Sequence, residues 1–582
     1  MISMFGFRRS SPQAALQLSW RRPAALCGGA LFVVALLLLA PSGQTATAAE
    51  AERGMVATVH PLATDAGVEV LRRGGNAADA AIAAALTLGV VDGHNSGIGG
   101  GCFIVVRTSD GELLAIDGRE TAPRRATRDM YLRDGKPVGE LSQTGPLAVG
   151  TPGALAAYDH LVKKVGRLEL QQLIEPAAKI AQDGFPIDEV YASRLAAHVE
   201  PLSRFTGSRD ALLKDGEPYR RGEILQQPDL ARTYREIGEH GIDWFYRGEF
   251  ARRVGEWMEQ NGGILSPEDF ADYQTLERQP VRSTYRDLTI IGYPPPSSGG
   301  VHVAQILNML EPFDLKIMNE VDRTHLIVET MKRAFADRAH WLGDPAFAKV
   351  PRGLIDKDYA GRLAATIDKQ KATLVDRYGQ PPRAGTDLFG KHTTHIAAAD
   401  AEGNWVAITT TVNTSFGSKV IVPGTGVVLN NQMDDFSAAP GVPNAFGLVG
   451  AEANAIVPGK RPLSSMSPTI VLRDDEPVMT LGAAGGPKII TGVLLTIIGH
   501  FDLGLSTEEA VAQARFHHQW APDQVMVEAE FSPSLVKQLQ TRGHRVTVAE
   551  QFSTLQAISR DGAGAPFVGV SDPRVPGKAA GY

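Results

Sequence analysis

The chain has 582 residues, a formal net charge of −7 and a hydrophobic fraction of 43%. That length exceeds what one small hydrophobic core organises, so two or more packed units are expected. The charged fraction of 21% is typical of a globular protein, and the absence of a basic excess argues against nucleic acid as a partner. The two cysteines are Cys27 and Cys102. Because Cys27 falls in the leader described next, the remaining chain offers neither an intrachain disulfide nor a cysteine-rich metal site.

The first fifty residues predict a targeting segment. A basic start is followed by an apolar run at residues 24–40 and by small residues at 46–49, which is the order found in a cleaved secretory leader. We therefore expect a leader at residues 1–49 and a periplasmic or secreted protein. An uncleaved membrane anchor is the alternative, although the apolar run is shorter than the roughly 20 residues that a spanning helix needs. The pair Arg8-Arg9 is a weak match to a twin-arginine signal.

Beyond the leader, strands alternate with helices. The pattern predicts a strand at 55–59, a helix at 61–73 that ends at a Gly-Gly pair, and an alanine-rich helix that Asn76 caps and that reaches about residue 91. A glycine-rich loop comes next. Two strands at 102–107 and 112–117, with a Ser-Asp-Gly turn between them, then predict a hairpin.

From about residue 150 onward the predicted secondary structure changes. Residues 150–375 are predicted to be mainly helical, and residues 379–392, rich in Gly, Pro and charge, predict an exposed loop. After this loop the chain favours strands, which we expect at 393–399, 405–413, 469–473 and 478–481. Strands early and late with helices between them predict sheets sandwiched between helical layers, an α+β fold.

The hairpin that follows the exposed loop carries the first candidate for chemistry. If its turn centres on Glu402, Thr393 lies directly opposite Thr411. Directly opposed side chains have Cβ atoms about 5 Å apart, which is within hydroxyl hydrogen-bonding reach. Threonine is also common in strands for packing reasons alone, so the spacing by itself leaves a structural role open.

Thr393 becomes a candidate nucleophile if it becomes a chain terminus. A free α-amine has a pKa of about 7.7 to 8.0 and can act as general base for the hydroxyl of its own residue. The same hydroxyl can first attack the His392 carbonyl and form an ester that water cleaves, so that one group performs maturation and catalysis. No Ser-His-Asp or nucleophile-elbow motif is present to supply another base.

Long motifs on both sides of this point extend the interpretation. They are Ser96-Gly97-Ile98-Gly99-Gly100-Gly101, Asp117-Gly118-Arg119-Glu120, Thr393-Thr394-His395, Thr411-Val412-Asn413-Thr414-Ser415-Phe416-Gly417, Asn430-Asn431-Gln432-Met433-Asp434-Asp435-Phe436 and Lys460-Arg461-Pro462-Leu463-Ser464-Ser465-Met466-Ser467-Pro468. From about residue 55 to residue 582 the chain resembles the γ-glutamyltransferases, which are N-terminal-nucleophile hydrolases. The resemblance implies a four-layer αββα sandwich, built from both halves of a cleaved precursor.

The resemblance also implies roles for residues that bind a γ-glutamyl donor. Such a donor carries an α-carboxylate, which Arg119 is expected to hold as a planar fork, and an α-ammonium, which Asp435 is expected to pair with. The residues implied to assist are Ser464 and Ser465 at the carboxylate, and Glu120, Asn413 and Gln432 at the ammonium. Each has an ordinary alternative: the Arg-Glu pair as a surface ion pair, the Asp-Asp pair as a turn, and the serines as loop residues.

Two further roles concern the reaction itself. Thr411 is implied to orient the Thr393 hydroxyl, and the backbone N–H groups of Gly485 and Gly486 are implied to stabilise the oxyanion. The glycines follow a predicted strand, and Pro487 fits the first position of the next helix. Amide groups at a helix N-terminus stabilise negative charge, although a simple Gly-Gly connection is the structural alternative.

The lid loop departs from the family pattern. Many bacterial members carry a tyrosine over the pocket after the Asp-Asp motif, and the matching residue here is Phe446. A phenyl ring covers a pocket but donates no hydrogen bond, which leaves the balance between water and amine acceptors open.

Three tempting features are better explained by structure. The glycine-rich segment 97–101 partly mimics a dinucleotide-binding loop, but a helix precedes it and a strand follows, which reverses the Rossmann order. Adjacent histidines such as His517-His518 point to opposite faces of a strand, so packing is favoured over metal binding. Cys102 is interpreted as a small core residue.

The sequence therefore predicts a self-cleaving enzyme with a large subunit at 50–392 and a small subunit at 393–582. It transfers a γ-glutamyl group from glutathione or a similar compound to water, an amino acid or a dipeptide, and no feature requires a cofactor or a metal. A related acylase with another acyl group, such as a cephalosporin acylase, is one alternative. An uncleaved protein that binds γ-glutamyl peptides is the other.

Overall fold

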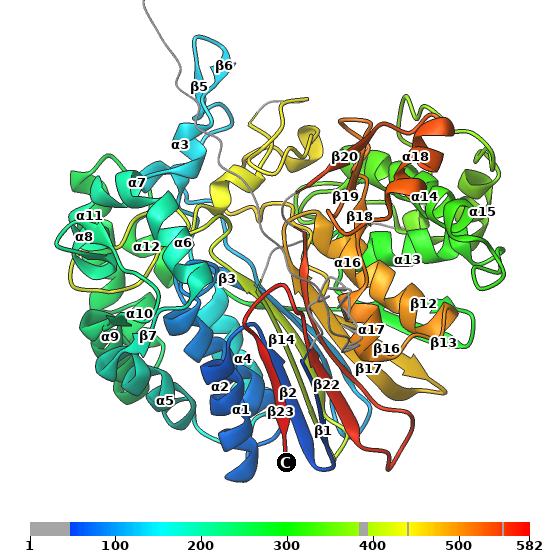
Figure 1. Cartoon of the computed structure of the whole chain (residues 1–582). Helices are drawn as coiled ribbons and strands as arrows, with labels where there is room; N and C mark the ends of the chain where they lie inside the picture. The colour runs from blue at the N-terminus through cyan, green and yellow to red at the C-terminus, as the bar shows by residue number, and fades with distance from the viewer. Residues whose placement is uncertain (1–46, 383–393, 439–440, 550–551) are drawn as a thin grey trace, which may run out of the picture. The chain divides into compact units, whose positions relative to one another are not determined.

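Two facing β-sheets form the centre of the structure (Figure 1). The computed structural model describes residues 47–382, 394–438, 441–549 and 552–582. In spatial order, sheet I contains β11 (Leu276–Arg278), β4 (Leu113–Gly118), β3 (Gly101–Arg107), β15 (Trp405–Thr411), β14 (Thr394–Asp400), β2 (Gly54–Thr58) and β23 (Lys578–Gly581). Sheet II contains β1 (Thr47–Ala51), β22 (Phe567–Ser571), β21 (Thr554–Ser559), β17 (Glu476–Ala484), β16 (Thr469–Arg473), β13 (Leu288–Gly292) and β12 (Val281–Tyr285).

Helices cover the outer face of each sheet. The helices on sheet I are α1 (Pro61–Arg72), α2 (Ala77–Val91) and α4 (Ala154–Val165), and those on sheet II are α13 (Gly299–Leu310) and α16 (Lys488–Ile497). Between the sheets lies a separate core that includes Phe103, Ala407 and Ile470. The order helix, sheet, sheet, helix confirms the predicted αββα sandwich.

The sequence pattern explains how β14 is buried on both faces. Ile396 and Ala398 face the helices, while Ala397 and Ala399 face sheet II, as the two-residue period of a strand requires. The helix that covers β14, α2, is buried along its whole length. Its alanines allow close packing, and Asn76 caps its first turn, accepting hydrogen bonds from the backbone N–H groups of Ala78 and Asp79.

The β14–β15 hairpin has the predicted register. Thr394 pairs with Thr410, His395 with Thr409 and Ala399 with Trp405. The next pair in the same register is the one predicted between positions 393 and 411, but Thr393 and His392 lie outside the described residues. The described part of the hairpin therefore begins at Thr394, the residue that follows the predicted nucleophile in the chain.

Strands from the two predicted subunits alternate within both sheets. In sheet I, β14 and β15 lie between β2 and β3, with antiparallel pairing on both sides. In sheet II, β13 pairs with β16, and β1 pairs with β22. Each half therefore completes hydrogen-bond ladders of the other, so cleavage of the chain near residue 392 leaves the fold bound together by backbone pairing.

The middle of the chain is mainly helical, as predicted, but it also supplies three strands to the two central sheets. Its helices include α5 (Leu170–Asp183), α6 (Glu189–Ala197), α7 (Val199–Ser203), α8 (Thr206–Leu212), α9 (Pro228–His240), α10 (Asp243–Tyr246), α11 (Glu249–Gln260), α12 (Pro267–Ala271), α14 (Glu320–Trp341) and α15 (Lys357–Ala364). The short strands β12 and β13 form one end of sheet II, and β11 forms one end of sheet I. Burial alternates along β12, a signal of only five residues within a predominantly helical segment.

The remaining α-helices and strands lie outside the two central sheets. They are α3 (Glu140–Gln143), α17 (Thr507–Ala512), α18 (Pro533–Thr541), β5 (Leu132–Arg133), β6 (Lys136–Pro137), β7 (Phe185–Pro186), β8 (Leu213–Lys214), β9 (Glu217–Pro218), β10 (Ile224–Leu225), β18 (Phe516–His517), β19 (Val525–Val527) and β20 (Val546–Val548). Among the helices described, none is both long and apolar enough to cross a membrane. The predicted leader at 1–49 overlaps the start of β1, and residues 1–46 lie outside the described part.

The glycine-rich loop before β3 is explained by close backbone approach. A Cβ atom at Gly99 would lie 2.1 Å from the Val428 carbonyl oxygen, and one at Gly100 would lie 1.8 Å from that of Thr411. This loop therefore packs directly against the end of β15, where the predicted site begins. The Rossmann-like spacing is a consequence of packing, as expected.

Replacing Gly100 by alanine is expected to destabilise the protein by about 1–3 kcal/mol or more, because the added methyl group displaces the end of β15. The urea midpoint of unfolding measures this change. The matched control is Gly361→Ala within α15, where a Cβ atom meets nothing within 4 Å; it is expected to stabilise the helix by up to about 1 kcal/mol. Equal midpoints for the two variants would contradict the close-approach argument.

Candidate active site

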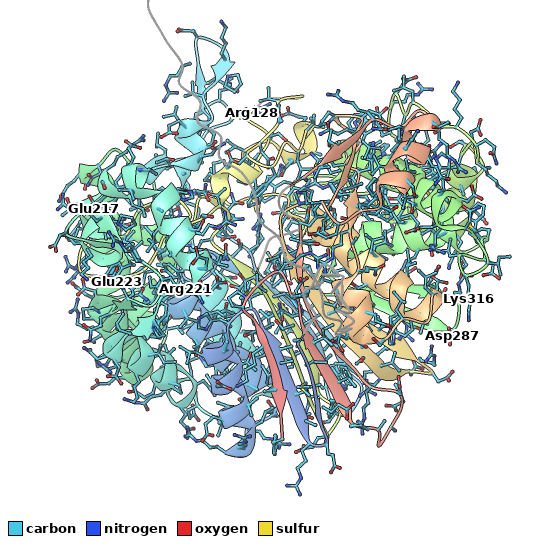
Figure 2. The ribbon with its side chains drawn as sticks, in the orientation of Figure 1. Arg128, Glu217, Arg221, Glu223, Asp287 and Lys316 are labelled. Carbon is cyan, nitrogen blue, oxygen red and sulfur yellow. The ribbon has the colours of Figure 1, made fainter. Side chains whose placement is uncertain are left out.

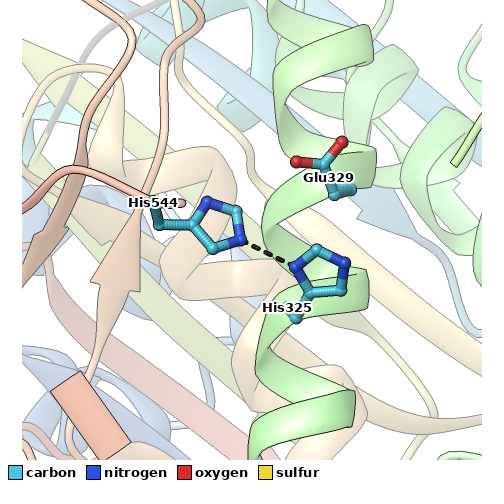
Figure 3. Close-up of side chains that lie close together, drawn as sticks. All are labelled: His325, Glu329 and His544. Atoms are coloured by element: carbon cyan, nitrogen blue, oxygen red, sulfur yellow. Dashed lines mark hydrogen bonds between the residues drawn. The ribbon is translucent and has the colours of Figure 1, made fainter. Parts of the chain in front are cut away.

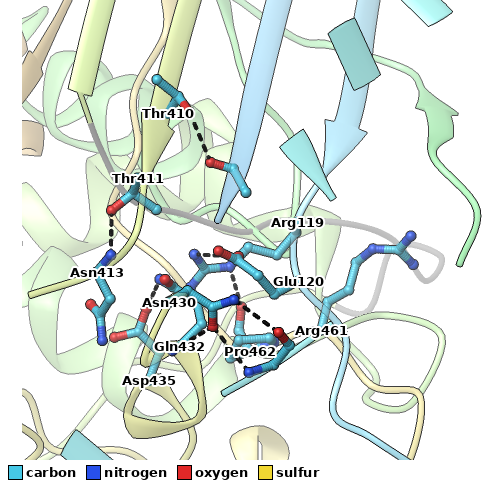
Figure 4. A network of polar contacts seen from close by, with 12 residues as sticks. Arg119, Glu120, Thr410, Thr411, Asn413, Asn430, Gln432, Asp435, Arg461 and Pro462 are labelled. Atoms are coloured by element: carbon cyan, nitrogen blue, oxygen red, sulfur yellow. Dashed lines mark hydrogen bonds and ion pairs between the residues drawn. The ribbon is translucent and has the colours of Figure 1, made fainter. Parts of the chain in front are cut away.

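The loop after β4 places Arg119 in the interior. Its side chain is fully buried. Its guanidinium donates from Nη2 to Asp435 Oδ2 at 2.5 Å, from Nη1 to Glu120 Oε2 at 3.4 Å, and from Nε to the Pro462 carbonyl oxygen at 3.2 Å (Figure 4). A guanidinium has five N–H donors, so two remain for a ligand. The pair Arg119-Glu120 is therefore an internal cluster, and the surface ion-pair alternative is wrong.

The two adjacent aspartates have separate partners. Asp435 lies at the end of a 3-10 turn, Gln432–Asp435, and accepts from Gln432 Nε2 at 3.0 Å in addition to Arg119. Asp434 points away from this cluster and accepts from Ser142 Oγ at 2.6 Å and from the Ala445 backbone N–H at 3.0 Å. One acid thus faces the arginine, and its neighbour anchors the start of the predicted lid.

Several buried polar atoms around this cluster have no partner in the part of the chain that the structure describes. They are Glu120 Oε1, Asn413 Oδ1, Gln432 Oε1, Ser464 Oγ and Ser465 Oγ. A buried polar group left without a hydrogen bond costs about 1–3 kcal/mol, and native proteins keep few of them. All five belong to residues predicted to bind the donor. Their gathering around Arg119 and Asp435 indicates a site whose hydrogen bonds a ligand completes.

Thr411, the residue predicted to orient the nucleophile, lies at the end of β15 and close to this cluster. The Thr411 hydroxyl accepts from the Asn413 backbone N–H at 2.7 Å, and Asn413 Nδ2 donates to the Asn431 carbonyl oxygen at 3.0 Å (Figure 4). Asn413 has a φ of 82°, a left-handed conformation that asparagine tolerates better than most residues. The predicted contact between Thr411 and Thr393 lies outside the described residues and stays a prediction.

The predicted oxyanion glycines and the lid residue line a common cavity of about 570 Å³, together with Asn413. Gly485 and Gly486 follow β17 and have φ values of 127° and 60°. A Cβ atom at Gly486 would lie 2.9 Å from the Phe446 ring, so the lid residue packs directly over this glycine. Pro487 was predicted as the first helical residue but is the N-cap of α16, so the helix begins one residue later, at Lys488.

The sequence analysis missed a buried carboxyl group at the start of β14. Asp92, which follows α2, accepts from Thr394 Oγ1 at 3.2 Å and from Asn95 Nδ2 at 2.9 Å. Burial raises the pKa of Asp92 to about 8, against the lowering effect of these hydrogen bonds and of Arg194. His94 Nε2 lies 3.3 Å from Asp92 Oδ1. Burial lowers the pKa of His94 to about 3, so the Asp92 carboxyl group and the His94 imidazole are both neutral at neutral pH. A lone aspartate after a helix gives no sequence signal for this contact.

The Asp92→Asn variant is expected to gain stability over the wild type as the pH rises from about 4 to 8. The folded-state pKa of about 8 lies above the ordinary value of 3.8 for an aspartate, so unfolding releases a proton in this window and the wild type loses stability there. Asparagine keeps the neutral shape without titrating. Urea midpoints at several pH values measure the difference, with the exposed turn variant Asp474→Asn as control. A constant difference across this window would contradict the assigned burial.

Asn430 is a second residue that the sequence analysis did not single out. Its Nδ2 donates to the carbonyl oxygens of Gly99 and Gly150 at 2.9 and 2.8 Å, and its Oδ1 accepts from the backbone N–H groups of Gly150 and Gln432 at 3.0 and 2.9 Å. It therefore joins the glycine-rich loop to the turn that carries Asp435. The motif that begins with Asn430 was visible in the sequence, but Gly99 and Gly150 lie 331 and 280 positions away from it along the chain.

The features assigned to packing are confirmed as such. His517 and His518 are both fully buried. His517 Nδ1 lies 3.0 Å from Thr491 Oγ1, and His518 Nε2 lies 3.0 Å from Asp523 Oδ1. Cys102 lies in the core between sheet I and its helices.

Three other side chains with metal-binding atoms, His325, Glu329 and His544, meet in the described part of the chain (Figure 3). His325 Nε2 lies 2.8 Å from the carbonyl oxygen of Asp368 and must donate to it, so His325 Nδ1 accepts from His544 Nε2 at 2.7 Å. Both Glu329 oxygens already accept hydrogen bonds, from Arg333 and from the hydroxyl and N–H of Thr373. The cluster is therefore a hydrogen-bonded contact between α14 and the segment before β20.

The four layers, with a polar pocket at the end of β15, define the class of the protein as an N-terminal-nucleophile hydrolase fold. The gamma-glutamyltranspeptidase family model matches residues 63–582, and the chain belongs to this family. The glutathione hydrolase proenzyme of Escherichia coli K12 is 43% identical over 538 residues, which are 91% of this chain and 92% of that protein.

Two solved structures are similar as well. The cephalosporin acylase from Bacillus halodurans has a TM-score of 0.83 and 30% identity, over 92% of this chain and 97% of that one. The γ-glutamyltranspeptidase of Helicobacter pylori has a TM-score of 0.53 and 40% identity, over 54% of this chain and 91% of that one.

Proposed function

We propose that this chain is the precursor of a γ-glutamyltransferase that cuts itself before Thr393. The mature enzyme removes the γ-glutamyl group from glutathione or a similar donor and transfers it to water, an amino acid or a dipeptide. The observation that carries this proposal is the buried set around Arg119 and Asp435, where opposite charges and five unpartnered polar atoms surround the place for a zwitterionic group. Membership of the γ-glutamyltranspeptidase family supports it.

The donor's two charged groups fit this set. The α-carboxylate accepts from the two remaining N–H groups of Arg119 and from the hydroxyl groups of Ser464 and Ser465. The α-ammonium donates to Asp435, which lies beside Arg119, and to the unpartnered Gln432 oxygen. A donor held at both charges directs its γ-carbonyl outward, toward the cavity that Asn413 and Gly485 share.

The proposed reaction needs only groups of the chain and the substrates. The Thr393 hydroxyl attacks the γ-carbonyl and passes its proton to the free α-amine of the same residue. The backbone N–H groups of Gly485 and Gly486 stabilise the oxyanion. Cleavage of the amide bond returns that proton to the leaving amine and gives an ester with Thr393. A water molecule or an amine then attacks this ester and loses a proton to the α-amine. The α-amine passes that proton to the departing Thr393 oxygen, which releases the γ-glutamyl product and restores the hydroxyl.

We propose that the same hydroxyl makes the two subunits, residues 50–392 and 393–582, which remain together as a heterodimer. The alternation of strands from both halves within each sheet supports this assembly. The Helicobacter pylori chain is covered to 91% by a match to only 54% of this chain, as expected for one of two product chains. The leader motif supports export to the periplasm or beyond.

Two rival functions make different demands on the site. A cephalosporin acylase is similar in structure to this chain, but an acyl group without an α-ammonium has no use for the buried Asp435 beside Arg119. A protein that binds γ-glutamyl peptides without turnover keeps that pair and stays uncleaved. The joint presence of the charge pair and the glycine pair therefore favours γ-glutamyl transfer.

The first test is the purified wild-type protein on a denaturing gel, with N-terminal sequencing of the smaller band. We expect bands of about 37 and 20 kDa, scaled by residue number from 62.3 kDa, and a small chain that begins Thr-Thr-His. The mature protein is then given γ-glutamyl-p-nitroanilide and glutaryl-p-nitroanilide, which lacks the α-ammonium. Preference for the glutaryl compound would favour the acylase function. An intact, inactive chain would favour a protein that binds γ-glutamyl peptides without turnover.

A further inference from the structure

A buried arginine near the end of α14 lacks a partner. Arg338 lies three residues before the last residue of this helix and is only 4% exposed. Its Nε atom has no hydrogen-bond partner among the residues that the structure describes, and the same residues provide no ion pair for its guanidinium. Arg221 also lacks an ion pair with the described residues, but it is exposed and water solvates its charge (Figure 2). Because a buried ion without a partner is costly, Arg338 requires a counter-charge that Arg221 does not need.

The acids near Arg338 do not supply this counter-charge. Burial lowers the pKa of Arg338 to about 10, and Asp435 raises it only in part, so the guanidinium stays charged at neutral pH. Asp435 is itself paired with Arg119 at 2.5 Å. Burial raises the pKa of Glu120, the other acid beside Arg119, to about 8, so Glu120 is mostly neutral at neutral pH. Two guanidinium groups therefore face at most one ionised carboxylate, which leaves one positive charge in excess.

A small cavity lies beside the unpaired arginine. It has a volume of about 20 Å³ and is lined by Arg338, Ser437 and Asn444 among others, and a cavity of roughly 10–15 Å³ already holds one water-sized particle. The buried Ser437 Oγ atom also lacks a partner within the described part of the chain. Asn444 Nδ2 contacts Asp435 Oδ1 at 3.5 Å and has a second N–H group. A guanidinium, a hydroxyl and an amide are thus available as donors around a space for one small particle.

We propose that this cavity binds a small monovalent anion of the halide class, such as chloride. The ion supplies the counter-charge for Arg338 and accepts hydrogen bonds from Arg338 Nε, Ser437 Oγ and Asn444 Nδ2. A water molecule fits these donors less well, because it carries no charge and must itself donate two hydrogen bonds. Asp435 also lines the cavity, but its pairing with Arg119 offsets the repulsion between its carboxylate and the ion.

The size and lining of the cavity select the class of anion. A halide is only slightly larger than water, whereas acetate, phosphate or the carboxylate of a substrate needs a larger space. Much of the remaining lining is apolar, formed by Phe436, Val442, Leu448 and Leu463, which suits a weakly hydrated ion. The ion joins α14 of the predicted large subunit to the turn and the predicted lid of the small subunit. This binding is independent of the proposed function, so either can fail without the other.

The first test is the thermal unfolding midpoint of the wild-type protein as gluconate is replaced by chloride at constant ionic strength. Gluconate has the same charge as chloride but is too large for the cavity. A ligand that binds only the folded state stabilises it in proportion to the logarithm of its concentration above the Kd. The midpoint is therefore expected to rise by about 1–3 °C for each tenfold increase in chloride. Equal midpoints in chloride and gluconate would overturn the proposal.

Substitutions assign the chloride effect to the cavity. Arg338→Met is expected to abolish the dependence on chloride, and Ser437→Ala is expected to raise the chloride concentration required by about tenfold, as the loss of one hydrogen bond to a charged group does. The matched controls are Arg221→Met, which removes an exposed arginine, and Arg333→Met, which removes another buried arginine of α14, one that pairs with Glu329 at 2.8 Å. Both controls are expected to keep the wild-type dependence. A dependence that persists in Arg338→Met, or that disappears in both controls, would overturn the proposal.

A second measurement needs no variant and decides the question if Arg338→Met does not fold. Crystals of the wild-type protein soaked in bromide are expected to show an anomalous scattering peak within hydrogen-bonding distance of Arg338 Nε and Ser437 Oγ. Bromide peaks confined to the protein surface, with a water molecule in this cavity, would overturn the proposal.

Discussion

A Thr393→Ala variant is expected to remain a single chain of about 62 kDa and to lose γ-glutamyl transfer by about 10⁴-fold or more, as the loss of a covalent nucleophile does in other hydrolases. The methyl group of alanine cannot attack the His392 carbonyl, so the chain is not cut and no free α-amine forms. A denaturing gel and an anilide assay measure both effects. The fold is expected to persist, since β14 begins only at Thr394.

Thr393→Ser is the matched control for this variant. Serine keeps the hydroxyl group and the position of the α-amine, so cleavage is expected to proceed more slowly and to give a small chain that begins Ser-Thr-His. Efficient cleavage of the alanine variant at the same bond would show that another group, or a separate protease, cuts the chain. An uncleaved serine variant with wild-type stability would assign the required property to the threonine methyl group.

An Arg119→Ala variant is expected to reduce kcat/KM for γ-glutamyl donors by about 100-fold or more while it still cuts itself. Truncating one partner of a buried charge pair costs about 2–5 kcal/mol, and each 1.4 kcal/mol corresponds to tenfold. The loss is expected mainly in KM, because the guanidinium is proposed to contact the donor's carboxylate and not the reacting bond. The variant also leaves Asp435 and Glu120 without their cation, so its unfolding midpoint is expected to fall.

Two matched variants separate binding from stability. Arg278→Ala removes another buried arginine, which pairs with Asp117 at 2.6 Å; it is expected to lower stability with little effect on donor KM. Arg119→Lys keeps the charge without the planar fork, so it is expected to restore stability more than donor affinity. Unchanged donor kinetics in Arg119→Ala would refute the assignment of Arg119 to the donor's carboxylate. Equal effects of Arg119→Ala and Arg278→Ala on donor KM would show that the effect of Arg119→Ala is a general loss of packing.

Local signals predicted most of the fold. The caps and periods of α1 and α2 follow from neighbouring residues in the chain, and the register of the β14–β15 hairpin follows from the position of its turn. The strands β12 and β13 were missed because each has five residues inside a helical stretch. Their place at one end of sheet II depends on β16, whose residues lie far along the chain.

The sequence by itself determined the family and predicted the nucleophile and the residues for the donor, because those signals are ordered motifs within single segments. Only the tertiary structure decided that Arg119 and Glu120 are buried against Asp435, that Asp92 contacts Thr394, and that Arg338 and Ser437 line one cavity. These contacts join residues as many as about three hundred positions apart. Burial and charge balance are properties of all the elements packed around a group, so no single segment specifies them.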